Sequence, residues 1–142
     1  MTPEFDRSLS RYAELIVKVG LNLQPGQRLL VRAPIDAAPL ARHVAAQAYD
    51  LGARLVEVLY NDPDLMLTRY RHAPADAFTE HSNWPVTAGL EYAENGQAIL
   101  SIVGSDPDLL KGIDPERISQ VQRTEGRNFA PLSRLISADA VN

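Results

Sequence analysis

The sequence predicts an α/β fold in three layers, with a small and mainly parallel sheet built from βαβ units and helices on both of its faces. Two short apolar segments, 28–33 and 54–60, flank a segment with helical periodicity at 36–51. Strand, helix and strand joined by tight turns form a βαβ unit, which implies a parallel pair of strands. A further apolar segment at 97–103 adds a third strand. Residues 1–142 are therefore expected to form a single α/β domain.

The first element is expected to be a helix that begins at Thr2-Pro3. Threonine is a good N-cap, and a proline at the first helical position loses no hydrogen bond because that N–H has no partner within a helix. Apolar residues recur at helical spacing from Phe5 to Val19, and Gly20 ends the segment. The turn NLQPGQ then leads into the strand RLLVRA.

The helix between the first two strands is expected over residues 36–51. One side carries an apolar stripe, formed by Leu40, Val44, Ala48 and Leu51. The opposite side is polar and carries Asp36, His43, Gln47 and Asp50. His43 is accordingly expected to be a solvated residue.

The second half of the chain is expected to be mainly helical. Helices are predicted over 63–71, over 74–94 with a break near Asn83-Trp84-Pro85, from Pro107, from Pro115, and over 131–136. Most of these segments begin at a proline, which favours the first position of a helix and disfavours its interior.

The segment SDPDLLKGIDPE, residues 105–116, holds acidic residues beside a glycine and resembles a metal loop at first sight. A calcium loop of the EF-hand kind that starts at Asp106 needs an acid where Leu110 stands and a glutamate where Arg117 stands, so the pattern fails. Asp106 and Asp114 each precede a proline, as Asp62 does, which predicts N-caps. The acids that follow meet the positive ends of helix dipoles.

Asp62 and Asp106 are the two candidate cleft-lining residues, because each follows a predicted strand. Ligands of open α/β sheets gather beyond the carboxyl ends of the strands. No catalytic, cofactor-binding or metal-ligating residue is predicted. The chain has no cysteine, His72 and His81 match no zinc-binding spacing, and no serine-hydrolase elbow or glycine-rich phosphate loop occurs.

The charge and hydropathy of the chain indicate which kinds of partner it is expected to have. The formal net charge of −4 does not favour nucleic acid, although a cluster at Arg69–His72 leaves RNA contact open as an alternative. No apolar segment approaches the roughly 20 residues of a membrane span. The first residues have no apolar signal core, so the chain is expected to be cytoplasmic.

Four stretches together resemble the amino-terminal part of the metallo-aminopeptidases of the aminopeptidase T, aminopeptidase S and PepS type. They are YAELIVKVGLNLQPGQRLLVRAPIDAAPLAR at 12–42, LGARLVEVLYND at 51–62, LTRYRHAP at 67–74 and SIVGSDPDLLKGIDPERI at 101–118. The stretches occur in the family's order and spacing. The likeness runs from about Phe5 to Asn142.

The resemblance implies that the chain is the amino-terminal, non-catalytic domain of a metal-dependent aminopeptidase, which removes amino-terminal residues from peptides. Family enzymes are much longer, form homodimers, and use a pair of divalent metal ions, zinc or cobalt, held by a carboxyl-terminal domain. Their amino-terminal domain helps to limit what enters the catalytic chamber. No metal-ligand motif of the family has a counterpart here, so this chain alone is expected to hold no cofactor and to be inactive.

The chain stops at ISADAVN, where a family member would enter its next strand. It is therefore expected to be a fragment, a proteolysed product or the product of a truncated gene. The alternative is a stand-alone truncated paralogue that acts as a small-ligand-binding or assembly module. The reading frame after Asn142 distinguishes the two.

Overall fold

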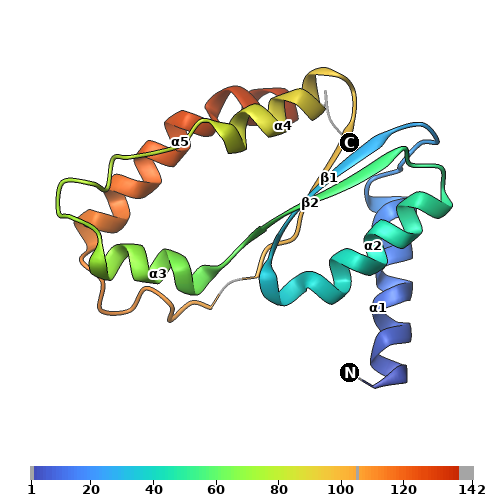
Figure 1. Ribbon diagram of the computed structural model, residues 1–142, viewed down its shortest axis with the longest axis horizontal. Helices are drawn as coiled ribbons and strands as arrows, with labels where there is room; N and C mark the ends of the chain where they lie inside the picture. The colour runs from blue at the N-terminus through green and yellow to red at the C-terminus, as the bar shows by residue number, and fades with distance from the viewer. Residues whose placement is uncertain (1, 105, 138–142) are drawn as a thin grey trace.

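The computed structural model describes residues 2–104 and 106–137, and these form a three-layer α/β arrangement (Figure 1). The predicted fold class is confirmed. The end at Asn142 lies outside the described residues. In chain order the elements are α1 (Pro3–Leu15), the π-helical segment η1 (Ile16–Gly20), β1 (Arg28–Pro34), the 3-10 turn η2 (Ile35–Ala37), α2 (Ala38–Asp50), β2 (Leu55–Asn61), α3 (Pro63–His72), α4 (Trp84–Glu94), β3 (Ala98–Ser101) and α5 (Pro115–Ser137).

The sheet has the strand order β2-β1-β3, and both pairs are parallel. Leu29 of the central strand β1 lies opposite Val56 of β2 and Ala98 of β3. Leu29, Leu30 and Val31 are all buried, because helices cover both faces of β1. This double burial explains why β1 has a run of apolar residues instead of an alternating pattern.

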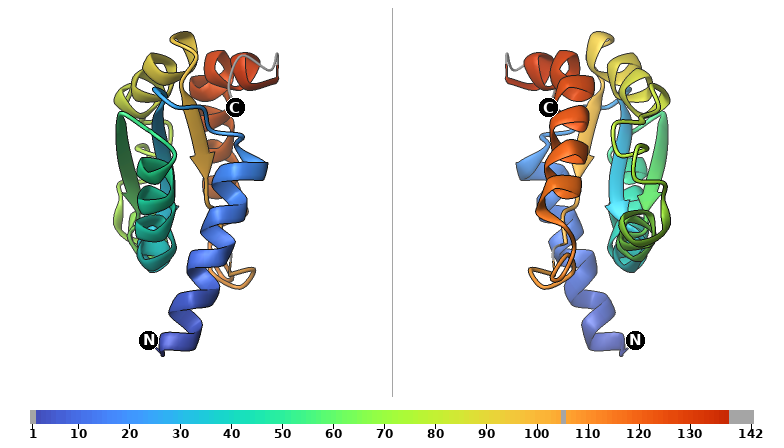
Figure 2. Two further views of the ribbon diagram at one scale, coloured as in Figure 1. Left: turned by 90° about the vertical axis from the view of Figure 1, so that its right-hand side faces the viewer. Right: turned by 90° about the vertical axis from the view of Figure 1, so that its left-hand side faces the viewer.

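Helices cover the two faces of the sheet, as the sequence predicts (Figure 2). On one face α1, η1 and α2 pack Val17, Val44 and Ala48 against Leu29 and Val31. On the other face α4 and α5 pack against the sheet, and the core there is formed by Leu30, Tyr92, Ala93, Ile99 and Leu132. No helix of the described residues is long and apolar enough to cross a membrane.

A small third cluster joins α3 to the first half of α5, to one side of the sheet (Figure 1). Tyr70, Phe78 and Val121 are buried there, and the rings of Tyr70 and Phe78 stack with centroids 6.0 Å apart. Arg117 of α5 lies over the Phe78 ring at 5.0 Å and donates a hydrogen bond to the Tyr70 carbonyl. This cluster fixes α3, and with it the segment that follows β2.

The helix predicted over 74–94 is wrong for residues 74–83, which form turns and bends. The Arg69 guanidinium donates to the carbonyl oxygens of Ala77 and Glu80, which a helix would need for its own hydrogen bonds. Burial of Phe78 in the third cluster then holds the segment in this non-helical path.

The helices predicted from Pro107 and over 131–136 need correction as well. Residues 107–112 form successive turns, with i to i+3 hydrogen bonds such as Leu109 N–H to Asp106 O, and no helix. Pro131 lies inside α5 and does not start a separate helix. An interior proline costs about 3 kcal/mol, but α5 continues because Leu132, the next residue, is buried in the core.

The third strand is shorter than predicted, covering Ala98–Ser101 of the expected 97–103. Its pairing with β1 ends where Ile102 N–H donates to Arg32 O. Pro34 has no N–H to donate to β3, so the ladder between β1 and β3 ends there, although Pro34 still pairs with Asn61 of β2.

Candidate functional site

A hollow of about 730 Å³ lies where the carboxyl ends of the strands meet, and we call it the strand-end hollow. Pro34 at the end of β1, Asn61 at the end of β2 and Gly104 after β3 all line it. The position agrees with the general rule that ligands of open α/β sheets bind beyond the strand ends.

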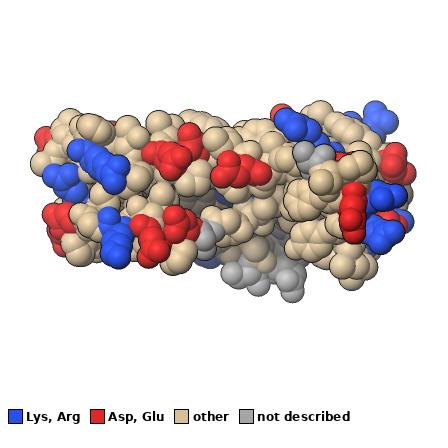
Figure 3. Space-filling view, turned by 90° about the horizontal axis from the view of Figure 1, so that it is seen from below, with Lys and Arg blue, Asp and Glu red and all other residues tan. Residues whose placement is uncertain are grey.

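Four carboxylates and several apolar side chains line the strand-end hollow. The acids are Asp36, Asp62, Asp64 and Asp106, and among the described residues no Lys, Arg or His joins them. The apolar part includes Ile35, Met66, Leu109 and Leu110. Figure 3 views this end of the molecule and shows acidic side chains toward the middle of the face, with both acidic and basic side chains toward its two ends. The hollow therefore suits a group that combines positive charge with apolar surface.

Asp62 and Asp106 both lie in this lining. Asp62 is confirmed as the N-cap of α3, whereas the N-cap prediction is wrong for Asp106, whose carboxylate makes the same contact at the start of turns that no helix follows. Asp62 Oδ1 accepts from Asp64 N–H at 3.0 Å, and Asp106 Oδ1 accepts from Asp108 N–H at 2.9 Å. Asp114 makes the same contact at the start of α5. Ligand binding by Asp62 and Asp106 stays a prediction.

The strand-end hollow does not fit a metal ion. Divalent ions need three or more converging donors, and the described residues contain no group of three His, Cys, Asp or Glu side chains placed to hold one. Asp62 and Asp106 each already use one carboxylate oxygen as a backbone cap. The described residues that line the strand-end hollow therefore do not form a metal site.

His43 is not the solvated side chain that the sequence predicts. Its Nε2 lies 2.8 Å from Asp6 Oδ1 of α1, and its side chain is only 24% exposed. The predicted polar side of α2 partly faces α1, so this contact connects the two helices. His72 and His81 are exposed and do not approach the strand-end hollow, since neither lines it.

The Arg69–His72 cluster does not form a surface for stacking RNA bases. Tyr70, the aromatic residue that such stacking needs, is buried against Phe78. Arg69 is occupied by the carbonyl oxygens of Ala77 and Glu80. These contacts are structural, which weakens the RNA alternative.

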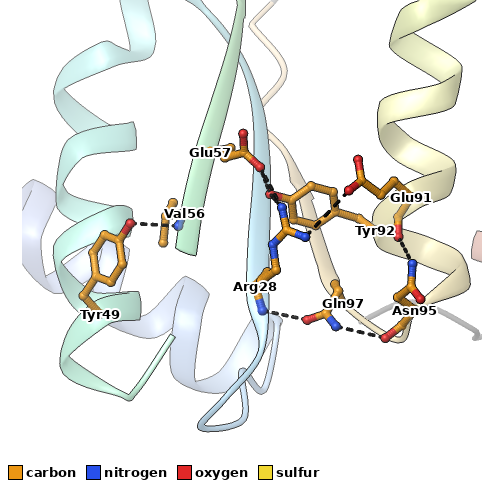
Figure 4. Close-up of polar contacts among 8 residues, drawn as sticks. All are labelled: Arg28, Tyr49, Val56, Glu57, Glu91, Tyr92, Asn95 and Gln97. Carbon is orange, nitrogen blue, oxygen red and sulfur yellow. Dashed lines mark hydrogen bonds and ion pairs between the residues drawn. The ribbon is translucent and has the colours of Figure 1, made fainter. Parts of the chain in front are cut away.

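A polar network lies at the opposite, amino-terminal end of the strands (Figure 4). Arg28 Nη2 lies 3.1 Å from Glu57 Oε1, and its guanidinium lies over the Tyr92 ring at 4.8 Å. The Tyr92 hydroxyl donates to Glu57 Oε1. Burial, followed by this hydrogen bond, raises the pKa of Tyr92 to about 12. The network joins β1 and β2 to α4. Because it lies at the end of the sheet opposite the strand-end hollow, its role is to hold these elements together.

Arg32 is a residue that sequence reasoning missed. It follows Arg28 by four positions on the same face of β1 and lines a second hollow of about 310 Å³, which we call the Arg32 hollow. A charged residue within an otherwise apolar strand is the signal that points to it, since both RLLVRA arginines depart from the pattern of a fully buried strand.

These features define the class of the protein as an open parallel α/β domain with ligand-sized hollows at its strand ends. Residues 5–142 match the family model described as thermophilic metalloprotease (M29). The chain belongs to this family of metalloproteases.

The relatives are aminopeptidases. The chain is 45% identical to aminopeptidase 2 of Geobacillus stearothermophilus over 95% of its own length, and 38% identical to aminopeptidase AmpS of Bacillus subtilis (strain 168) over 97%. The solved structure of wild-type AmpT from Thermus thermophilus superposes with a TM-score of 0.89 at 35% identity, over 94% of this chain. The chain spans about a third of the length of these relatives, 33%, 34% and 34% respectively.

Proposed function

We propose that this chain is the amino-terminal, non-catalytic domain of a metal-dependent aminopeptidase, residues 1–142 forming that single domain. One observation carries the proposal: nearly the whole chain matches a third of each aminopeptidase, yet its described residues hold no convergent set of metal donors. Catalysis by the pair of divalent ions, zinc or cobalt, then belongs to another part of a longer enzyme. The enzyme removes amino-terminal residues from peptides as a cytoplasmic homodimer.

The role of the domain is to shape substrate access and to support assembly. The strand-end hollow supports the first part, because its four carboxylates attract the α-ammonium group that every aminopeptidase substrate carries. Its apolar residues, such as Met66 and Leu110, suit the side chain of a first residue. Asp62 and Asp106 supply negative charge to the lining of the strand-end hollow and do not contact the peptide bond that is hydrolysed.

The same hollow supports a second candidate function from another class. A cavity of about 730 Å³ is in the size range of small-ligand sites, so the chain could act by itself as a binding or assembly module. The two candidates differ in one respect: the first requires that changes in the hollow alter peptide hydrolysis by a complete enzyme.

A chimeric enzyme tests the proposed function. Residues 5–142 replace the matching segment of Thermus thermophilus aminopeptidase T, and hydrolysis is measured on leucine p-nitroanilide and on peptides of increasing length. The Asp62→Asn and Asp106→Asn changes remove charge while keeping a capping oxygen, since asparagine caps as well as aspartate. We expect KM to rise for peptides with little change in kcat, because only ground-state attraction is removed.

Asp114→Asn is the matched control, because Asp114 makes the same cap but does not line the strand-end hollow. It should leave KM unchanged. A folded chimera whose KM values respond equally to all three changes, or to none, contradicts the access role and favours the independent module.

A further inference from the structure

Arg32 carries a charge that the described residues leave unpaired. Its Nε is buried without a hydrogen-bond partner, as is that of Arg28, but unlike Arg28 it takes part in none of the ion pairs among the described residues. The guanidinium lies over the Phe129 ring, whose centroid is 5.9 Å from Arg32 Cζ. Burial lowers the pKa of Arg32, so the folded protein holds this cation at a cost.

The contrast with Arg28 makes the missing partner informative. Both arginines project from the same face of β1, where Arg28 pairs with Glu57 and contacts Tyr92. Among residues 2–104 and 106–137, an acidic side chain therefore pairs with Arg28 and none pairs with Arg32. An unpaired, partly buried arginine at a sheet's ligand-facing end is typical of a site for an external anion.

The surroundings of Arg32 suit a small anion. Arg32 pairs in register with Ser101 of β3, and Asn61 of β2 lies on the same face. All three residues line the Arg32 hollow. Among the described lining residues there is no Asp or Glu. The hollow of about 310 Å³ is large enough for a carboxylate group and the peptide unit attached to it.

The Arg32 hollow and the strand-end hollow share part of their walls. Pro34, Asn61 and Gly104 line both. Of the described lining residues, four in the one hollow carry a carboxylate and one in the other carries a guanidinium, so the carboxyl edge of the sheet offers opposite charges in adjoining spaces. A ligand with an ammonium group at one end and a carboxylate at the other complements this arrangement.

We propose that Arg32 binds the carboxylate of a short peptide, through a guanidinium fork aided by Ser101 and Asn61. The inference rests on the proposed function, since it names the substrate class that the domain holds: short peptides with a free carboxyl end. Arginine suits the task because its planar donors match the two carboxylate oxygens. In the complete enzyme Arg32 is a positioning residue that selects peptides by their distal end.

Binding to the 142-residue chain tests the proposal without any catalysis. The probes are Leu-Gly-Gly, its carboxyl-terminal amide and inorganic phosphate. Their binding is measured by calorimetry and by the shift of the Arg32 side-chain N–H resonance. We expect Leu-Gly-Gly to bind at least about tenfold more tightly than the amide, and Arg32→Met to abolish the difference. Arg54→Met is the matched control, because Arg54 is exposed just before β2, at the other end of the sheet.

Stability separates a binding role from a structural one. If Arg32 is held unpaired for a ligand, Arg32→Met should raise Tm by about 2–4 °C, because removing an unpaired buried charge is stabilising. Arg32→Lys keeps the charge without the fork and should lose most of the preference for the free carboxylate. An Arg32→Met protein that unfolds or has a lower Tm contradicts the proposal, since the arginine is then structural.

The other possible binding results overturn the proposal. Equal binding of the peptide and its amide, or no binding of either, overturns the carboxylate assignment while the chimeric enzyme still tests access independently. Binding of phosphate without binding of Leu-Gly-Gly overturns it as well, and leaves a general anion site.

Discussion

Gly89 of α4 lies directly against Leu132 of α5, so closely that a Cβ atom added at Gly89 would come within 2.5 Å of Leu132 Cδ2. Leu132 is 1% exposed and packs with Leu30 and Tyr92 in the core beneath these helices. A methyl group at Gly89 would push the leucine side chain out of its packed position, so the two helices approach this closely because Gly89 lacks a side chain. This contact places α5 over the sheet despite Pro131.

Gly89→Ala should therefore destabilise the protein. Overpacking a dense core costs about 1–3 kcal/mol, which exceeds the gain of up to about 1 kcal/mol in helix propensity. Urea unfolding measures the difference. Gly126→Ala is the control, because Gly126 of α5 is exposed with nothing within 4 Å, and it should stabilise the protein by about 0.5–1 kcal/mol. Equal effects of the two changes would mean that α4 and α5 do not pack this closely.

The two Asp-Pro caps of residues 106–116 should differ in importance. Asp114 caps α5, a helix of 23 residues, whereas Asp106 caps only a series of turns. Asp114→Ala should cost about 1 kcal/mol of unfolding free energy. Asp106→Ala should cost clearly less. Thermal unfolding of both variants checks the order, and a larger loss at Asp106 would show that the turns are more important to the fold than we infer.

Alkaline pH should weaken the fold through Tyr92. Its folded pKa of about 12 lies above the ordinary value of 10, so its stabilising effect is complete below pH 10 and is lost as the pH rises toward 12. The unfolding free energy should fall by up to about 1.4 kcal/mol per pH unit in that window. Tyr92→Phe keeps the ring but cannot ionise, so its slope should be smaller.

Some slope should remain in Tyr92→Phe, because burial also raises the pKa of Tyr70. Denaturant titrations between pH 8 and pH 11 give both slopes. If wild type and Tyr92→Phe lose stability in parallel as the pH rises, the pKa of the Tyr92 hydroxyl, which donates a hydrogen bond to Glu57, is not raised in the folded state.

Zinc or cobalt should not stabilise the 142-residue chain. A ligand that binds only the folded state raises Tm, by an amount equivalent to about 2.7 kcal/mol at a hundred times its Kd. Because no three donors converge among the described residues, Tm in the presence of either ion should equal Tm in a chelator. A rise in Tm that saturates with metal concentration would reveal a site that the strand-end carboxylates do not suggest.

Local chemistry made most of the sheet and its covering helices predictable. Thr2-Pro3 and Asp62-Pro63 mark helix starts in the sequence, and the structure has α1 and α3 beginning at these prolines. The apolar run of β1 likewise predicts a strand buried on both faces. Each of these sequence patterns depends on a few neighbouring residues, so it predicts its element without knowledge of contacts with distant parts of the chain.

Contacts between distant residues explain the errors. Pro131 stays helical because Leu132 packs against Gly89, and residues 74–83 avoid a helix because Arg69 takes their carbonyl groups. His43 meets Asp6 across two helices. For the candidate site, the predicted strand ends indicated Asp62 and Asp106 as lining residues. That no described residue pairs with Arg32 depends on side chains from several elements, which the sequence does not place.

Hydrolysis by the chain alone is the most direct test of the central claim that catalysis lies elsewhere. The 142-residue protein is assayed on leucine p-nitroanilide with added cobalt or zinc, after repurification from metal and at several protein concentrations. The account predicts no turnover above the metal-only blank. Turnover that scales with protein concentration and survives repurification would contradict it.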